Sequence, residues 1–235
     1  MYRLDFHSHT GHSRDSALPA AALLRDAVRA GVNVLCVTDH DTIDGGRQAA
    51  SIARVRADEH PGLTVIVGEE VMSSEGEIIG LFLTETIAPG LPPAEVAKRI
   101  RGQGGIVTVP HPFDRLRGSR LHEGALRMLV GAGLVDAIEA RNARVTFPAD
   151  NDRAVTFARD HGLPIVGGSD AHMRGEAGAA YATLDVPPAT SADGLRAQLP
   201  AMRLGGGLSN PVVHLGSAAA RWGRRLGFLP EKIIL

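Results

Sequence analysis

Histidines and acidic residues occur in this chain as short clusters that could bind metal ions. His7 and His9 are separated by one residue, so on an extended strand both imidazoles point the same way and can reach one ion. A lone His-x-His pair is more often structural than metal-binding. Further clusters strengthen the metal hypothesis, and they are Asp39-His40, Glu69-Glu70, His111-Pro112 and Ser169-Asp170-Ala171-His172.

Each of these clusters comes directly after a short apolar run that we expect to form a strand. The expected strands are residues 2–6, 33–37, 64–67, 78–83, 106–109, 135–139 and 164–167. The carboxyl ends of parallel strands share one face of an α/β barrel, so residues far apart in sequence meet there. Clustered buried acids are costly unless a cation offsets their charge, which favours a metal centre at that face.

Helical segments alternate with these strands. They are predicted over residues 19–30, 44–60, 93–102, 122–132, 149–161 and 191–201. This alternation predicts an α/β fold, a distorted (β/α)7-type barrel, because the dinucleotide fingerprint of an open doubly wound sheet is missing. We expect one barrel domain over residues 1–203. A glycine-rich loop and a short basic helix then predict a C-terminal extension, residues 204–235, packed on the barrel.

Composition narrows the class of protein. The 235 residues are 44% hydrophobic and 22% charged, and 25 basic and 26 acidic residues leave a net charge of −1, so no overall field attracts a polyanion. The one cysteine, Cys36, lies in an apolar run and predicts a buried thiol in a reducing compartment. We find no secretory signal and no apolar run of about 18 residues, so we expect a cytoplasmic protein with no membrane partner.

Taken in order, the five motifs resemble those of the PHP (polymerase and histidinol phosphatase) superfamily of multinuclear metallohydrolases. The resemblance runs from residue 2 to about residue 185 and rests on Asp5-Phe6-His7-Ser8-His9, Thr38-Asp39-His40-Asp41, Gly68 to Glu70, His111-Pro112 and Ser169-Asp170-Ala171-His172. It implies a PHP barrel that binds two or three divalent transition metals (Zn, Mn or Fe).

The resemblance also implies which residues bind which metal. A first ion would be bound by His7, His9, Glu70 and Asp170, and Glu70 would bridge to a second ion that also takes His111. A third ion would use Asp15, His40 and His172, with Asp15 standing where some members have histidine. Near residues 78–81 the resemblance implies a histidine, and this chain has Glu77 instead. Either Glu77 binds the second metal through oxygen or that metal is weakly held, and oxygen-rich coordination would favour manganese or iron over zinc.

Two metals about 3.5 to 4 Å apart can share a hydroxide and neutralise the oxygens of a phosphoryl group, so phosphoester hydrolysis is the expected chemistry. Arginines near the motifs would bind phosphate oxygens. Four loop arginines are candidates, and we rank Arg115 and Arg144 above Arg117 and Arg174. Asp39 is expected to support a ligand imidazole rather than bind metal.

The expected enzyme is a phosphoric ester hydrolase that cleaves a small phosphorylated substrate, a nucleotide or another phosphomonoester or diester, with a metal-bridged hydroxide. A competing hypothesis is a 5'-3' exonuclease on short oligonucleotides, although aromatic residues, which would stack on bases, make up only 4% of the chain. Two more hypotheses are a non-catalytic metal-binding PHP module and an amidohydrolase that cleaves C–N bonds. The sequence does not predict an oligomeric state.

Overall fold

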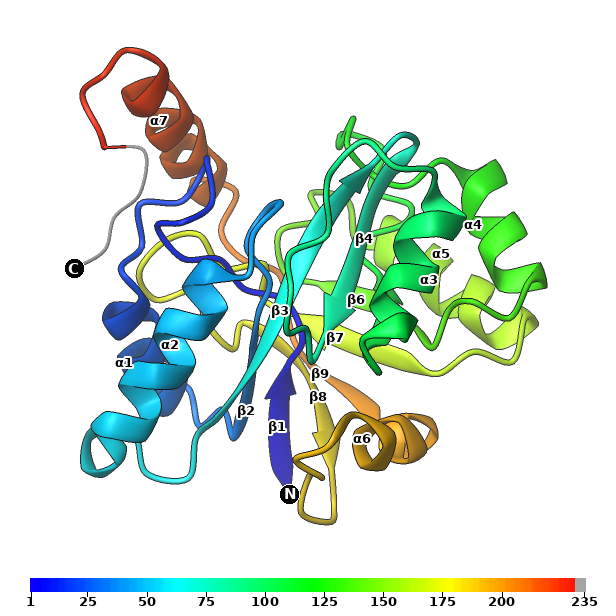
Figure 1. Cartoon of the computed structure of the whole chain (residues 1–235), viewed down its shortest axis with the longest axis horizontal. Coiled ribbons are helices and arrows are strands. Elements are labelled where there is room, and N and C mark those ends of the chain that lie inside the picture. Colours follow the sequence, from blue (N-terminus) through cyan, green and yellow to red (C-terminus); the bar gives the residue numbers. More distant parts are fainter. Residues whose placement is uncertain (231–235) are drawn as a thin grey trace.

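One nine-stranded sheet organises the computed structural model, which describes residues 1–230 (Figure 1). The end of the predicted extension, residues 231–235, lies outside the described residues. The sheet order is β7-β6-β5-β4-β3-β2-β1-β8-β9. The strands are β1 Tyr2–Asp5, β2 Val34–Val37, β3 Thr64–Ser73, β4 Gly76–Leu81, β5 Ile106–Val109, β6 Ala137–Asn142, β7 Ile165–Gly168, β8 Ala180–Leu184 and β9 Arg203–Gly206.

The sheet curls until the segment after β1 meets β7. The Phe6 backbone N–H donates to the Gly167 carbonyl at 3.1 Å, and the Asp170 N–H donates to the His7 carbonyl at 2.8 Å. An isolated parallel bridge joins Ser8 to Ala171 one step further along. The prediction of a distorted α/β barrel is therefore confirmed.

Strand β4 departs from the predicted parallel arrangement. It runs antiparallel to both β3 and β5. A two-residue turn, Ser74-Glu75, joins β3 to β4, and so short a connection can only reverse the chain. Gly76 follows the turn at φ 121°, a backbone conformation that favours glycine. The expectation that residues 78–83 continue a parallel sheet was wrong. Strands β8 and β9, also antiparallel, were not predicted.

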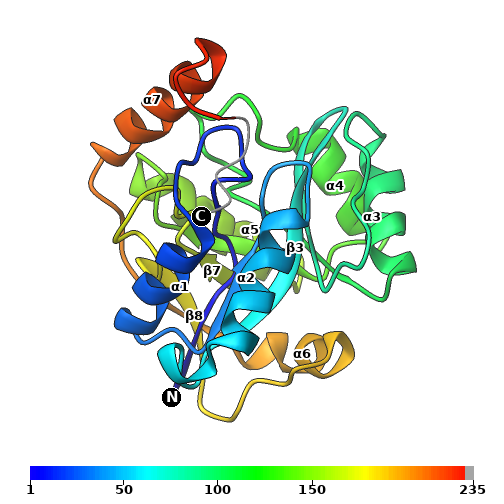
Figure 2. The ribbon, with the colours of Figure 1, turned by 60° about the vertical axis from the view of Figure 1, so that its left-hand side comes forward.

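Helices α1 to α5 cover the outer surface of the sheet, and α6 and α7 lie at opposite ends of the barrel, as Figures 1 and 2 show from two directions. The helices are α1 Ala20–Arg29, α2 Asp44–Val55, α3 Pro93–Gly102, α4 Glu123–Gly131, α5 Pro148–Asp160, α6 Ala192–Gln198 and α7 Val213–Arg225. Proline begins α3 and α5, where its fixed φ suits the first helical turn and its missing N–H is not needed.

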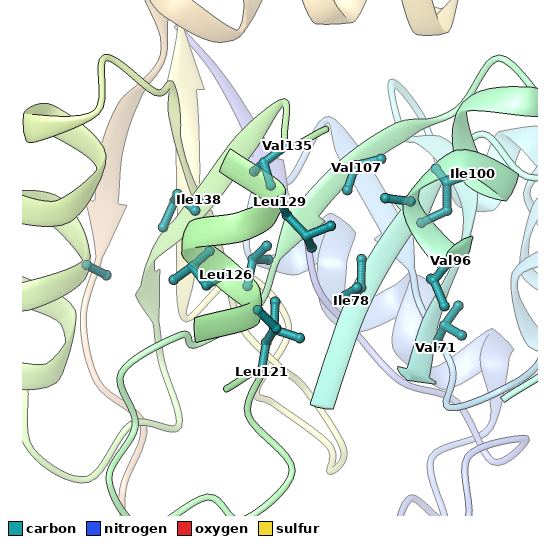
Figure 3. Close-up of a cluster of buried hydrophobic side chains, with 14 of the residues drawn as sticks. Val71, Ile78, Val96, Ile100, Val107, Leu121, Leu126, Leu129, Val135 and Ile138 are labelled. Atoms are coloured by element: carbon teal, nitrogen blue, oxygen red, sulfur yellow. The ribbon is translucent and has the colours of Figure 1, made fainter. Parts of the chain in front are cut away.

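Apolar side chains form layers on both sides of the strands. One cluster lies between α3, α4 and the strands β3 to β6, and Figure 3 shows Ile100, Leu126 and Ile138 among its members. A second cluster takes side chains from every strand from β1 to β8, including Leu4 and Cys36, and therefore fills the barrel interior. This apolar interior supports the polar residues at the carboxyl ends of the strands.

Helix α7 lies across the loop that follows β1, residues 6–19, as both Figure 1 and Figure 2 show. Strand β9, which pairs with β8, connects the barrel to this helix. The division into residues 1–203 and 204–235 stays a prediction. Within the described residues, no helix has both the length and the apolar character to cross a membrane.

Candidate metal centre

Nine side chains predicted as metal ligands converge at one end of the barrel, where the carboxyl ends of the parallel strands lie beside the amino end of antiparallel β4. All of them are buried or nearly so, although they come from separate parts of the chain. They are His7, His9 and Asp15 after β1, His40 after β2, Glu70 on β3, Glu77 on β4, His111 after β5, and Asp170 and His172 after β7. The barrel therefore assembles ligand atoms from residues up to 165 positions apart, as the strand-end argument predicted.

The first group surrounds the His7-x-His9 pair. The Nε2 atoms of His7 and His9 are 3.0 Å apart. Glu70 Oε2 lies 3.3 Å from His7 Nε2 and 3.4 Å from His9 Nε2, and Asp170 Oδ1 lies 3.6 and 3.4 Å from the same atoms. Two ring nitrogens and two carboxylate oxygens thus point toward one another, an arrangement suited to a shared cation.

Two neighbouring groups share atoms with the first. Glu70 Oε1 lies 3.1 Å from His111 Nε2, and Glu77 Oε2 lies 3.8 Å from the same nitrogen. On the other side, Asp15 Oδ1 is 3.4 Å from His40 Nε2 and 3.2 Å from His172 Nε2. These short distances place the candidate ligands in contiguous groups.

Unsatisfied buried oxygens test whether cations fit these groups. Asp15 Oδ1, Glu77 Oε2 and Asp170 Oδ1 are buried without a hydrogen-bond partner among the described residues. An unpaired buried acceptor costs free energy, and a bound cation removes that cost. All three oxygens face ring nitrogens of the predicted ligands. The donor set therefore fits divalent transition metals.

Charges within the centre shift the pKa values of its members. Burial lowers the pKa of His7, but Glu70 and Asp170 together raise it well above its usual range. Burial also lowers the pKa of His40, but Glu70 and Asp15 raise it to about 10. Burial raises the pKa of Glu70, yet His7 and His40 hold it well below its usual value. At neutral pH the metal-free centre therefore carries protons on His7 and His40.

Metal binding is expected to release protons. A metal ion takes the neutral imidazole, so protons held at pH 7 by histidines with raised pKa values must leave, and affinity must increase with pH. Calorimetric titration of the metal-free protein with Mn²⁺ in two buffers of different ionisation enthalpy measures the release. We expect different apparent enthalpies in the two buffers, and equal enthalpies would contradict the proton assignment.

A layer of hydrogen bonds orients the ligands from behind. Glu139 Oε1 lies 3.1 Å from His7 Nδ1, and Glu139 Oε2 accepts from the His111 backbone N–H at 2.8 Å. Asn142 Nδ2 donates to Glu139 at 3.0 Å and to Asp170 Oδ2 at 3.2 Å. A carboxylate behind a ligand imidazole fixes its tautomer and orientation, so Glu139 serves that function for His7.

Gly168 leaves the room that this layer needs. A Cβ at this position would collide with Glu139 Oε1 and with the His7 side chain. Gly168→Ala is therefore expected to weaken metal binding by about 10–100-fold, the usual cost of disturbing the groups behind a ligand. Metal titration followed by dialysis measures the loss. Gly131→Ala is the matched control, because a Cβ there meets no atom within 4 Å, and unchanged affinity in Gly168→Ala would contradict the assignment.

A cavity of about 620 Å³ opens above the centre. The candidate ligands His40, Glu77 and His172 line this cavity. Four arginines also line it: Arg14, Arg117, Arg144 and Arg221. Arg117 is the closest to the ligands, since its Nη2 donates to Asp170 Oδ2 at 2.7 Å. The cavity therefore combines candidate metal ligands with four arginines.

The sequence of the chain is similar to a known family and to two known proteins. A PHP-associated family model matches residues 148–203. The protein MJ1587 of Methanocaldococcus jannaschii is 37% identical over 122 residues, which are 48% of this chain and 68% of that protein. MJ0417 of the same organism is 31% identical over 180 residues, covering 76% of this chain and 69% of the relative. The family match places a PHP-superfamily domain in this chain.

A solved structure agrees with this assignment at the level of fold. It is a two-domain protein from Bacteroides vulgatus containing a predicted PHP-like metal-dependent phosphoesterase, with a TM-score of 0.65 and 19% identity. The similarity covers 88% of this PHP chain and 65% of the Bacteroides chain. The chain therefore spans less than two thirds of that two-domain protein.

The predicted arginines occupy different places in this PHP structure. Arg115 is not among the described residues that line the cavity. It is bound instead by Asp150, with its Nε 2.9 Å from Asp150 Oδ1, and its side chain is 57% exposed. Arg174 pairs with Asp26 at 2.8 Å. The geometry therefore favours Arg117 over Arg115 as the arginine nearest the candidate ligands, and phosphate binding by Arg115 stays a prediction.

Arg144 lines the cavity, but most of its N–H donors contact other groups of the protein. Its Nη2 donates to the Val213 carbonyl and to Ser217 Oγ, both at 2.8 Å, and its Nε lies 3.3 Å from Glu176 Oε1. Its side chain is 4% exposed. These contacts favour a structural function for Arg144 over the predicted catalytic one.

Asp39 supports the centre through an intermediate residue. Its Oδ1 accepts from Ser13 Oγ at 2.7 Å, and Ser13 Oγ lies 2.9 Å from His9 Nδ1. Asp39 thus acts on the His9 imidazole through Ser13 rather than directly. Sequence reasoning missed Ser13 and Glu139. Glu139 could have been found, because it ends the predicted strand of residues 135–139 and the named ligands also lie near strand ends.

Proposed function

We propose that this PHP chain is a metal-dependent phosphoric ester hydrolase that acts on a small phosphorylated molecule, a nucleotide or another phosphomonoester or diester. The observation that carries the proposal is the arginine-lined cavity directly above the grouped histidines and carboxylates. Divalent metals bound there lower the pKa of water and neutralise phosphoryl oxygens. We propose His7, His9, Asp15, His40, Glu70, Glu77, His111, Asp170 and His172 as the residues that bind two or three such ions, of Mn, Fe or Zn.

The protein's own side chains would bind and orient the phosphoryl group. Arg117 lies beside Asp170 with its guanidinium facing the cavity wall, and the acids around it raise its pKa although burial opposes the rise, so it stays charged. Arg14 and Arg221 line the same cavity, and Arg221 Nη1 lies 3.8 Å from Asp15 Oδ2. A planar guanidinium can bind two phosphate oxygens at once, so these residues favour a phosphorylated substrate over a neutral one.

The size and lining of the cavity favour a small substrate. Among the described residues that line it there is no Phe, Tyr or Trp, so a stacking platform for several bases is missing from that wall. This observation supports a small-molecule substrate over the short oligonucleotides of an exonuclease. The full set of nine candidate ligands supports an enzyme over a non-catalytic module. A cytoplasmic location stays a prediction.

Assays with two chromogenic esters test the proposal. The purified protein, loaded with Mn²⁺, is assayed on p-nitrophenyl phosphate and on its bis-ester, with a nucleotide panel in parallel. We expect hydrolysis of at least one phosphoester, loss of activity with EDTA and recovery on adding Mn²⁺. No phosphoester hydrolysis together with cleavage of an amide panel would replace the proposal by the amidohydrolase hypothesis.

A further inference from the structure

The candidate ligands Asp15 and His172 lie further from the strand ends than the other ligands on the same two loops, His7, His9 and Asp170. Asp15 belongs to the loop of residues 6–19, and His172 belongs to the loop of residues 169–179 after β7. Their atoms nevertheless meet, with Asp15 Oδ1 3.2 Å from His172 Nε2. Holding two loops at this distance requires contacts from elsewhere in the fold.

Helix α7 contacts the first loop through Arg224. Its Nη2 donates to the Gly11 carbonyl at 2.9 Å and to the Ser16 carbonyl at 2.8 Å, on either side of Asp15 in sequence. Burial lowers the pKa of Arg224, although Asp15 and Asp39 oppose the shift. Arg224 therefore bridges two backbone carbonyls of the loop across more than 200 residues of sequence.

The same helix contacts the second loop through a chain of side chains. Arg144 donates to Val213 and Ser217 of α7 and pairs with Glu176. Glu176 Oε2 in turn accepts from the backbone N–H of His172 at 2.9 Å and of Met173 at 2.8 Å. The position of His172 is thus connected to α7.

The two loops are also joined directly, and α7 approaches them closely. Ser16 Oγ donates to the His172 carbonyl at 3.0 Å. Gly216 of α7 packs on Met173, where a Cβ would lie 2.6 Å from the methionine sulfur. One helix, two loops and their candidate ligands therefore form one connected unit.

We propose that α7 clamps the two loops and sets the Asp15–His172 pair at ligand distance, with Arg224 and Glu176 as the positioning residues. The inference rests on the proposed metal centre and concerns its third ion. The other candidate ligands are held without α7. The backbone N–H of Asp170 donates to the His7 carbonyl and that of His9 to the Ala171 carbonyl, both at 2.8 Å, and Glu139 of β6 holds His7 and the backbone of His111. Loss of the clamp should therefore weaken one metal position and spare the other two.

Titration with Co²⁺ alone tests the clamp, because its visible absorption reports each binding step and elemental analysis counts the ions. Wild type is expected to bind three. In Arg224→Met one step should become about 10–100-fold weaker, the range for residues that support ligands, with the other two steps unchanged. Arg225→Met is the matched control, since Arg225 is exposed beside Trp222 and should leave all three steps unchanged.

Glu176→Gln is a second variant, and it disturbs the loop that carries His172. Thermal unfolding of the metal-free proteins identifies any variant that fails to fold. A folded variant with selective weakening of one step supports the inference. Three unchanged steps in both folded variants, equal weakening of all steps, or a wild type that binds only two ions would overturn it. A wild type that binds no Co²⁺ would instead overturn the proposed function itself.

Discussion

Asp170→Ala is expected to lower kcat/KM for phosphoester hydrolysis by about 10³-fold, the upper range for removing one preorganised charged group. Asp170 Oδ1 faces both His7 and His9, whereas Oδ2 is held by Arg117 and Asn142. Its backbone adopts φ 53°, in the left-handed region, and its N–H donates to the His7 carbonyl. The surrounding structure therefore fixes this carboxylate at the centre of the ligand set.

Activity and metal content should fall together in this variant. Both are measured on the same preparation, by steady-state kinetics with Mn²⁺ and by elemental analysis. Asp160→Ala is the matched control, because Asp160 pairs with Arg159 on the exposed surface of α5 and should leave both quantities unchanged. Full activity with a full metal complement in Asp170→Ala would remove Asp170 from the proposed ligands.

The second large effect is expected for Arg117→Met, with kcat/KM lower by about 10²-fold. The Arg117 side chain is 19% exposed and donates to Asp170 Oδ2 at 2.7 Å, so its removal leaves a buried carboxylate oxygen with one fewer partner. It also removes a positive charge from the cavity wall, where the phosphoryl group would bind. We expect KM to rise and kcat to fall, since both the substrate and a ligand are affected.

Arg115→Met distinguishes the assignment of Arg117 as the phosphate-binding arginine from the sequence prediction, which ranked Arg115 higher. Arg115 is two residues away, carries the same charge and faces Asp150. The variant should retain kcat/KM within about twofold, as expected for a surface substitution away from the site. A larger loss in Arg115→Met than in Arg117→Met would show that the loop places its arginines differently when substrate is bound.

These two arginines illustrate where sequence reasoning ends. Clusters at strand ends could be predicted because the parallel barrel brings those ends together whatever the loops do. The direction of a loop side chain depends on tertiary partners instead. Asp150 of α5 binds Arg115, and a turn from Asp114 to Arg117 directs the second arginine toward Asp170. Neither contact has a signature in the local sequence.

The fold shows the same limit. Apolar runs located seven strands, but they did not reveal the reversal of β4, which depends on a turn of two residues. Strand β9, Arg203–Gly206, escaped prediction because it is short, rich in glycine and only partly buried. The contacts of Arg224 with Gly11 and Ser16 join residues more than 200 positions apart, so only the folded chain reveals them.

Anomalous diffraction from crystals grown with Mn²⁺ tests most directly whether the strand-end cluster is a metal centre. We expect two or three anomalous peaks at the carboxyl ends of the strands, each within coordination distance of the candidate ligands and at least one beside Glu70. Crystals of folded protein grown at saturating Mn²⁺ that show no peak among these side chains would contradict the metal assignment.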